Sequence, residues 1–281
     1  MTTDYTDDTD FAVVLVPNAA EKSQISTPSS AQSPIRIEQV APGCAVERPG
    51  GGAYWLIERR LSDIAPQCAA FTRRYGDLLM SEALILPEGT HWHVAEFAEC
   101  NPCSVVYLDI ETTGLVSGAP LFMIGLMEFD GRDFVIKQYF ARNYAEECHL
   151  IAALAEHLPK FRMMVTFNGR RFDAPYIRDR ATVNRTEIAW PPLHFDLLTE
   201  SRRRWARVLP DCKLITLEQH VCRRRRLDDV PGSLIPAIYH EFVHTQDASL
   251  MDRVIHHNAL DLLTMAELAL FMIVGQNDWT V

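Results

Sequence analysis

The chain has 281 residues, of which 48% are hydrophobic and 23% charged, and it carries a formal net charge of −10 at pH 7. This length and apolar content suffice for one large globular domain with additions. No apolar run approaches the roughly 20 residues that cross a bilayer, and the acidic N-terminus lacks the basic start of a signal peptide, so we expect a cytoplasmic protein without a membrane segment.

Residues 1–43 are rich in Thr, Ser, Asp, Gln and Pro, and they contain one short apolar run at 11–16. Such a segment buries too little apolar surface to offset the entropy of ordering, which predicts a disordered, flexible tail. We divide the rest of the chain into a small N-terminal accessory region at 44–103 and a main domain at 104–275.

The accessory region contains a glycine-rich turn at 49–53 and apolar stretches that predict short strands and a helix near 63–75. Two histidines, His91 and His93, flank a tryptophan and are possible paired ligands. We expect them to lie on a strand without a clear partner ligand and therefore to be structural.

The main domain shows hairpins followed by alternating strands and helices, which is typical of an α/β fold with a mixed sheet covered by helices. Asp130-Gly131 is a strong hairpin signal between the second and third strands. The predicted strands are 105–115, which runs into a turn at Thr-Thr-Gly, 121–129, 133–143, 162–167 and 193–198. The predicted helices are 146–158, 172–183, several after residue 199, and a long apolar helix at 249–274.

Acidic residues cluster where ligands gather in such sheets, at the carboxyl ends of strands. Asp109 and Glu111 lie at i and i+2 of the first strand of the main domain and share one face, where a divalent cation would offset their repulsion and desolvation. Asn168 follows a later strand, and Asp173 begins the next helix. Asp261 lies in the apolar final helix, where an acid usually has a partner.

These segments resemble the DEDD exonucleases, a superfamily with the ribonuclease-H-like fold. Asp109–Thr112 resembles the first motif, Asn168–Asp173 is similar to the second, and His257–Asp261 occupies the third. Arg226–Gly232 and the later HHNALD are similar to the bacterial YprB-like family of predicted exonucleases. The resemblance covers about residues 104–274 and implies a mixed five-stranded sheet flanked by helices.

The third motif of that superfamily has either Tyr with three residues before its Asp or His with four. This chain offers histidine at both spacings, His257 with three residues before Asp261 and His256 with four. His257 shares the helix face of Asp261, whereas His256 points about 100° away on a regular helix. We therefore assign the catalytic histidine to His257 and keep His256 as the alternative.

The resemblance implies a 3′–5′ exonuclease that hydrolyses single-stranded DNA or RNA with two Mg²⁺ or Mn²⁺ ions. The four acids Asp109, Glu111, Asp173 and Asp261 form an all-oxygen ligand set, which suits those metals. The histidine would orient or deprotonate the attacking water. Basic runs at 202–207 and 223–226 would hold the strand backbone. The substrate-binding residues that we expect are Thr112, Asn168, Phe172, Arg223 and Arg224.

Two alternatives remain open from the sequence. One keeps the fold and makes the protein a structure-selective endonuclease of the ribonuclease H kind. The other is a catalytically silent nucleic-acid-binding module, against which the intact acid set argues. The size of the reaction product separates the two nucleases.

Overall fold

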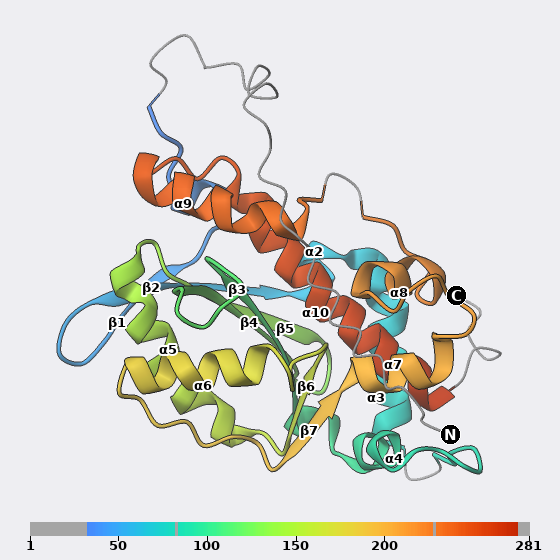
Figure 1. The fold of residues 1–281 in the computed structure, drawn as a ribbon. Coiled ribbons are helices and arrows are strands. Elements are labelled where there is room, and N and C mark those ends of the chain that lie inside the picture. The colour runs from blue at the N-terminus through green and yellow to red at the C-terminus, as the bar shows by residue number, and fades with distance from the viewer. Residues whose placement is uncertain (1–32, 82–83, 227–228, 275–281) are drawn as a thin grey trace, which may run out of the picture. The chain divides into compact units, whose positions relative to one another are not determined.

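The computed structural model describes residues 33–81, 84–226 and 229–274, so the predicted tail lies outside the described residues except for 33–43. The compact unit that begins at Pro34 is built on one sheet with the strand order β1-β2-β5-β4-β3-β6-β7 (Figure 1). Its strands are β1 (Cys44–Glu47), β2 (Ala53–Arg60), β3 (Val105–Thr112), β4 (Leu121–Phe129), β5 (Phe134–Phe140), β6 (Met163–Thr166) and β7 (Leu193–Asp196).

The mixed sheet is confirmed, but the prediction of five strands was wrong. β3 to β7 correspond to the five predicted strands, with β3, β4 and β5 antiparallel and β3, β6 and β7 parallel. β1 and β2 extend the same sheet because β2 pairs antiparallel with β5, whose edge would otherwise leave backbone groups unpaired. Gly50, Gly51 and Gly52 have φ of 93°, 92° and 83°, which closes the turn between β1 and β2.

Helices cover both faces of the sheet (Figure 1). The α-helices are α1 (Ile37–Val40), α2 (Leu61–Ile64), α3 (Ala69–Leu79), α4 (Trp92–Glu99), α5 (Glu147–His157), α6 (Asp173–Val183), α7 (Leu197–Trp205), α8 (Leu214–His220), α9 (Ile235–Thr245) and α10 (Met251–Val274). Short 3₁₀ turns are η1 (Pro66–Cys68), η2 (Pro102–Ser104), η3 (Tyr144–Glu146), η4 (Leu158–Lys160) and η5 (Gly232–Leu234).

The expectation that His91 and His93 lie on a strand was wrong. His91 is the N-cap of α4, with extended backbone angles, and His93 lies in the first turn of that helix. The spacing of two histidines around one residue resembles strand alternation, but the buried residues Val94 and Phe97 follow the helical i, i+3 spacing. Their packing against the core decides in favour of a helix.

The sheet separates two apolar cores, and alternation along β3 decides which core each of its side chains enters. Val106 and Leu108 belong to the core that contains residues of α5, α6 and α9. Tyr107 belongs to the core that contains residues of α3, α4, α7 and α10. Asp109 and Glu111 continue the alternation of Tyr107, so both carboxylates emerge on the face that α10 covers.

α10 is long and apolar enough to span a membrane by length and composition, but 78% of its most apolar window is buried inside the protein. This burial is that of a core helix of a folded domain. Its first turns, with Met251 and Val254, belong to one core, and the stretch from Ala259 to Ile273 belongs to the other. Asp261 lies just past the point at which the helix passes from one core to the other.

Candidate active site

Four acids from three separate elements lie near one another. Asp109 and Glu111 come from β3, Asp173 is the first residue of α6, and Asp261 comes from α10. Burial, followed by the charges of Asp261, Glu111 and Asp173, raises the pKa of Asp109 well above its usual range. The sequence predicts that these acids, distant in the chain, meet at the end of β3, and the structure places them close enough for their charges to act on one another.

The same repulsion acts on two other members of the set. Burial, followed by Asp261 and Asp173, raises the pKa of Glu111 well above its usual range. Burial raises the pKa of Asp173 to about 7, although hydrogen bonds from backbone N–H groups, including that of Ile110, act in the opposite direction. Carboxylates that cannot all ionise without a counter-charge, and that offer only oxygen, fit a hard divalent cation such as Mg²⁺ or Mn²⁺.

A buried amide holds the first acid in place. Asn258 is fully buried, and its Nδ2 donates to Oδ2 of Asp109 at 2.8 Å. Gln138 Nε2 donates in turn to Oδ1 of Asn258 at 2.9 Å. Gly125, the cross-strand partner of Asp109, leaves room for this amide, because a Cβ at that position would lie 2.1 Å from Oδ1 of Asn258. The side-chain orientation of Asp109 is therefore fixed by groups on β4, β5 and α10.

Of the two adjacent histidines, the structure brings His257 to the acids. Its Nδ1 lies 2.9 Å from Oδ1 of Asp229, and its Nε2 lies 3.5 Å from Oδ2 of Asp261. His256 is exposed, and Arg59 and Asp252 are the charged groups that act most strongly on its pKa. The geometry follows the helical spacing, which places residues four apart on the same face.

Arg226 contacts the acids directly, which differs from its predicted place in a strand-binding run. Its side chain is 3% exposed. Nε donates to Oε2 of Glu218 at 2.8 Å, Nη1 donates to Oδ2 of Asp229 at 3.2 Å, and Nη2 donates to Oδ1 of Asp261. Among the described residues, no three of the four acids bring their oxygens within 4.8 Å of one another. Cation binding therefore requires these acids to draw together, with Arg226 already holding Asp261.

The two arginines predicted to bind substrate have different environments. Arg223 is exposed, with a positive φ of 54°. Arg224 is held in an internal ion-pair network, with Nη1 3.2 Å from Oε1 of Glu218 and Nη2 3.0 Å from Oε2 of Glu267. A guanidinium committed to two buried carboxylates has little left to offer a phosphate.

A tight turn after β6 presents Asn168. This residue has a positive φ of 64°, which is uncommon for a side chain other than glycine. The backbone N–H groups of Asn168 and Arg170 donate to the two carboxylate oxygens of Asp196 at 2.9 and 3.0 Å. Asp196 also caps α7 by accepting from the N–H of Leu198. One buried carboxylate therefore fixes both the turn that carries Asn168 and the start of α7.

Two of the four acids, Asp109 and Asp261, line a cleft of about 560 Å³. The cleft combines these acids and Asp211 with the basic Arg202 and Lys213, which suits a phosphate chain bound next to a cation site. The cleft is lined by Asp109, Phe167, Asn168, Leu198, Arg202, Asp211, Cys212, Lys213, Leu214 and Asp261.

Thr112 and Phe172 are not among the lining residues of this cleft. The Thr112 hydroxyl donates to the carbonyl of Gly114 at 2.8 Å. The half-buried ring of Phe172 lies 5.5 Å, centroid to centroid, from that of Tyr176. Of the predicted substrate-binding residues, Asn168 is the one that reaches the cleft beside the acids.

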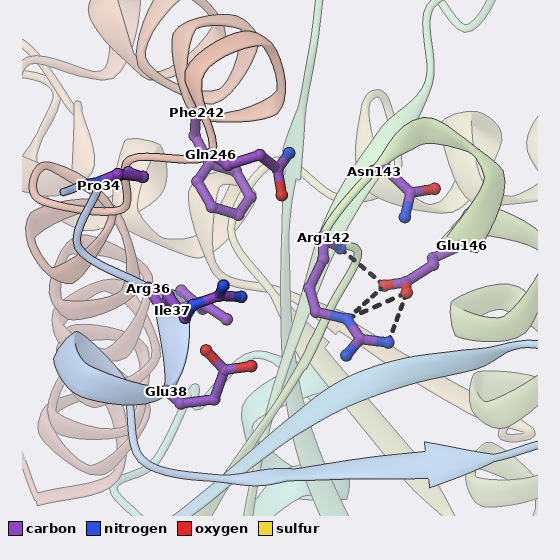
Figure 2. A pocket seen from close by; sticks show the side chains of 9 residues that line it. All are labelled: Pro34, Arg36, Ile37, Glu38, Arg142, Asn143, Glu146, Phe242 and Gln246. Atoms are coloured by element: carbon purple, nitrogen blue, oxygen red, sulfur yellow. Dashed lines mark hydrogen bonds and ion pairs between the residues drawn. The ribbon is translucent and has the colours of Figure 1, made fainter.

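A second cavity of about 380 Å³ shares no lining residue with the acid cleft (Figure 2). Figure 2 shows Arg142 and Glu146 joined to each other at one side of this cavity, with Nη2 of the arginine 2.6 Å from Oε1 of the glutamate. Phe242 and Gln246 line the same cavity. Two arginines, Arg36 and Arg142, and two glutamates, Glu38 and Glu146, line it, so their charges balance, and it holds none of the four acids.

Several positioning residues had a signal in the sequence that we did not use. Asp229 lies in the Asp-Asp-Val-Pro-Gly segment quoted for the family resemblance, and Asn258 lies inside the third motif. Gly125 is a single glycine within a strand of bulky apolar residues, which indicates the close approach of another group. Asp196 and Gln138 carried no such signal, because their partners are distant in the chain.

Comparison with known proteins supports the family assignment. A family model described as RNase_H superfamily matches residues 106–273. The uncharacterized protein YprB of Bacillus subtilis (strain 168) is 32% identical over 176 residues, a match that covers 61% of this chain and 42% of that protein. The chain thus spans less than half the length of this relative. Both matches confirm the predicted resemblance, and the first confirms the ribonuclease-H-like fold.

Among solved structures, a family B DNA polymerase from the hyperthermophilic archaeon Pyrobaculum calidifontis is similar over 60% of this chain and 24% of that chain. The sequence identity is 16% and the TM-score 0.49. A likeness of this degree carries no weight for function. The family match is what carries the assignment of the fold.

Proposed function

The chain belongs to the RNase H superfamily, and we propose that it is a divalent-metal-dependent 3′–5′ exonuclease acting on single-stranded nucleic acid. The observation that carries this proposal is the convergence of Asp109, Glu111, Asp173 and Asp261, in which burial and the neighbouring charges raise the pKa values of the first three. The 3′–5′ polarity follows from the resemblance of the three acid-bearing motifs to those of the DEDD exonucleases.

The four acids would hold two Mg²⁺ or Mn²⁺ ions. Such ions supply positive charge to the phosphodiester transition state and activate water for in-line attack. Asn258 and Gln138 keep the carboxylate of Asp109 oriented toward that site. Arg226 balances the negative charge of Asp261 and its neighbours from inside the protein.

His257 is placed to take a proton from the attacking water. Asp229 accepts the Nδ1–H of His257, which leaves the Nε2 lone pair on the side of Asp261. An imidazole held in that tautomer is a general base. Asp229 and His257 resemble the acid–histidine pairs of other hydrolases, in which the carboxylate orients the ring and stabilises the imidazolium after proton transfer.

The cleft supports a nucleic-acid strand as the substrate. Asn168 stands beside the acids on its strained turn, where its amide can contact the terminal nucleotide. Arg202 and Lys213 are exposed at the same cleft and would contact the backbone phosphates next to the terminal nucleotide. Arg223 is exposed as well and remains a candidate for more distant phosphates.

The full chain is tested with 5′-labelled single- and double-stranded DNA and RNA in Mg²⁺, Mn²⁺ or chelator, and the products are resolved on a sequencing gel. We expect stepwise loss of single nucleotides from the 3′ end of single strands, which stops when that end is blocked. Internal cleavage of a blocked strand would favour the structure-selective endonuclease. Tight binding without any cleavage would favour the silent binding module.

The assignment of the base is tested by two neighbouring substitutions. His257→Gln should lower kcat by about 10²- to 10⁴-fold, the usual contribution of a general base. His256→Gln is the matched comparison, one residue earlier on the same helix. A loss confined to His256→Gln would reverse the assignment and return the role to the alternative histidine. Single-turnover rates at saturating Mn²⁺ are the measurement.

A further inference from the structure

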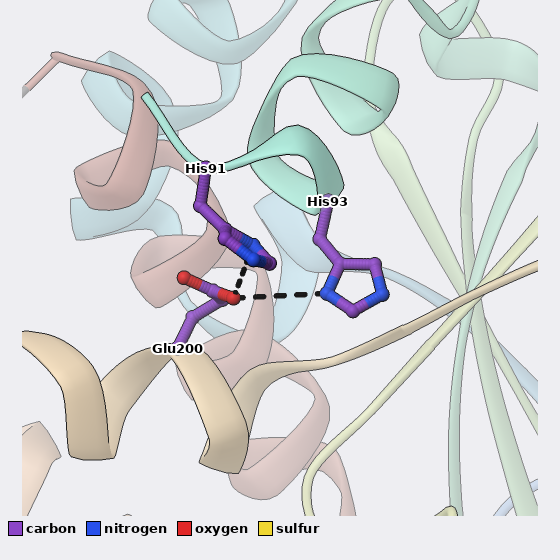
Figure 3. Close-up of side chains that lie close together, drawn as sticks. All are labelled: His91, His93 and Glu200. Carbon is purple, nitrogen blue, oxygen red and sulfur yellow. Dashed lines mark ion pairs between the residues drawn. The ribbon is translucent and has the colours of Figure 1, made fainter. Parts of the chain in front are cut away.

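A second cluster of metal-ligating side chains lies apart from the acid cleft. His91 and His93 extend from the N-terminal end of α4, and Glu200 extends from α7 toward them (Figure 3). Among the described residues, these three side chains form a group of His, Cys, Asp or Glu in which one donor atom from each lies within 4.8 Å of the others. They come from segments more than 100 positions apart in the chain.

The donor atoms are buried and lack hydrogen bonds. Nδ1 of His91, Nδ1 of His93 and Oε1 of Glu200 are all buried without a hydrogen-bond partner. Glu200 is 1% exposed and His93 is 8% exposed. An unpartnered buried carboxylate oxygen is costly, and nitrogen lone pairs pointing at it add to that cost unless a proton or a cation lies between them.

The distances suit a cation better than direct pairing. Oε1 of Glu200 lies 2.7 Å from Nδ1 of His91 and 3.6 Å from Nδ1 of His93. The distance between Oε1 of Glu200 and Nδ1 of His91 is that of an ion pair, but the angles at these atoms are not those of a hydrogen bond. A tetrahedral zinc ion with ligands at about 2.0–2.1 Å separates its donor atoms by roughly 3.3 Å. The two observed separations lie on either side of that value.

We propose that His91, His93 and Glu200 form a zinc site. Two imidazole nitrogens and one carboxylate oxygen are a ligand set typical of Zn²⁺, whereas the acid cleft offers the all-oxygen set that suits Mg²⁺ or Mn²⁺. A water molecule would complete the coordination on the side of His91, whose side chain is 22% exposed. The site is separate from the four acids and from the proposed nuclease reaction.

Two arginines limit the strength of this site. Arg203 Nε lies 3.6 Å from Oε1 of Glu200, from an exposed position. Arg170 Nη2 lies 3.2 Å from Nε2 of His93 and also donates to the carbonyl of His194 at 2.5 Å. A metal on Nδ1 leaves the proton of the ring on Nε2, so Arg170 must give up that contact and keep the one to His194. We expect Arg170→Met to bind Zn²⁺ more tightly for this reason.

The zinc would join the accessory region to the wall of the acid cleft. α4 precedes the part of the chain that matches the RNase H superfamily, which begins at residue 106. α7 carries Leu198 and Arg202, two residues of the acid cleft, on either side of Glu200. A bond between α4 and α7 would hold this wall in place without touching the acids.

The test uses the full chain, stripped of metal and then titrated with Zn²⁺ in excess Mg²⁺ to occupy the acid cleft. We expect one tightly bound zinc per chain. His91→Gln and Glu200→Gln should each weaken its binding by at least about 100-fold, more than the 10- to 100-fold that loss of an outer partner costs. Asp109→Asn, which changes the acid cleft alone, should leave that affinity unchanged. Zn²⁺ competition with a chromophoric chelator measures the constants.

X-ray absorption on the zinc-loaded protein provides the second readout, because two imidazole ligands are expected here. Circular dichroism checks that the variants remain folded, and His91→Gln changes the least buried of the three ligands. Equal zinc affinity in wild type and in both His91→Gln and Glu200→Gln would overturn the site. The site would also be overturned if Asp109→Asn lost the tightly bound zinc while His91→Gln and Glu200→Gln retained it.

Discussion

Replacing Asp109 with Asn is expected to abolish metal-dependent hydrolysis of single-stranded nucleic acid, with a loss of at least about 1,000-fold in kcat/KM. That factor corresponds to roughly 4 kcal/mol of transition-state stabilisation. Asn keeps the size of the side chain and its contact with Asn258, so the change removes charge and a metal ligand while preserving shape. The same loss is expected for Asp261→Asn. Activity close to wild type in either variant would refute the four-acid site.

The matched control is Asp252→Asn, which removes an exposed acid from the same helix as Asp261. Hydrolysis rates for this variant should stay within about twofold of wild type, because surface substitutions away from a site act weakly. Circular dichroism and isothermal titration with Mn²⁺ separate a loss of metal binding from a loss of fold.

Stability should move in the opposite direction to activity. The folded protein keeps a proton on Asp173 up to about pH 7, whereas an unfolded Asp releases it near its ordinary pKa of 3.8. The folded state therefore binds more protons between these values, and the contribution of this group to stability falls as pH rises from about 4 to 7. The pKa of Asp109 is raised in the same way, so replacing this carboxylate with a neutral amide removes the same cost to stability. In chelator, Asp109→Asn should therefore have a higher urea midpoint than wild type at pH 7, and Mn²⁺ should reduce the difference.

Arg226→Met is expected to lower the free energy of unfolding by about 3–5 kcal/mol, the cost of removing one partner from a buried ion pair. Its guanidinium is 3% exposed and contacts Glu218, Asp229 and Asp261, which would lose their shared cation. Burial lowers the pKa of this guanidinium, but Asp261 and Glu218 raise it above its ordinary value overall. Urea denaturation in chelator measures the effect.

Arg225→Met is the control, since Arg225 is the exposed neighbour in the same run. A rescue experiment sharpens the interpretation, because Arg226→Met with Glu218→Gln removes a buried charge of each sign. The double variant should recover part of the lost stability if charge balance is the cause. A small loss in Arg226→Met, equal to that in Arg225→Met, would contradict the internal role.

Local patterns predicted the parts of the site that depend on a single element. The i, i+2 spacing placed Asp109 and Glu111 on one face of β3, and the apolar surroundings of Asp261 indicated that it needed a partner. Helical spacing selected His257 over its neighbour, in agreement with the contacts to Asp229 and Asp261. These inferences succeeded geometrically because backbone periodicity alone decides which side chains share a face.

Features that depend on contacts between separate elements could not be predicted from the sequence. The run Arg223–Arg226 was interpreted as a basic surface, because composition does not reveal that alternate members turn inward to carboxylates. β2 joined the main sheet through β5, some 80 positions later, and so changed the strand count. Glu200 completed the histidine pair from a helix more than 100 positions away. For β2 and Glu200 the deciding partner lies far along the chain, and for the arginines the partners are both near, such as Glu218, and far, such as Asp261.

The position of α10 late in the chain has a consequence for the order in which the protein folds during synthesis. This helix follows all seven strands of the described residues, contributes to both cores, and supplies Asp261. During synthesis at about 5–20 residues per second, the sheet emerges from the ribosome before the helix that covers one of its faces. The nascent chain therefore exposes apolar sheet until α10 docks, and the fourth acid arrives with it. Docking of α10 on the sheet and assembly of the acid site are therefore one event.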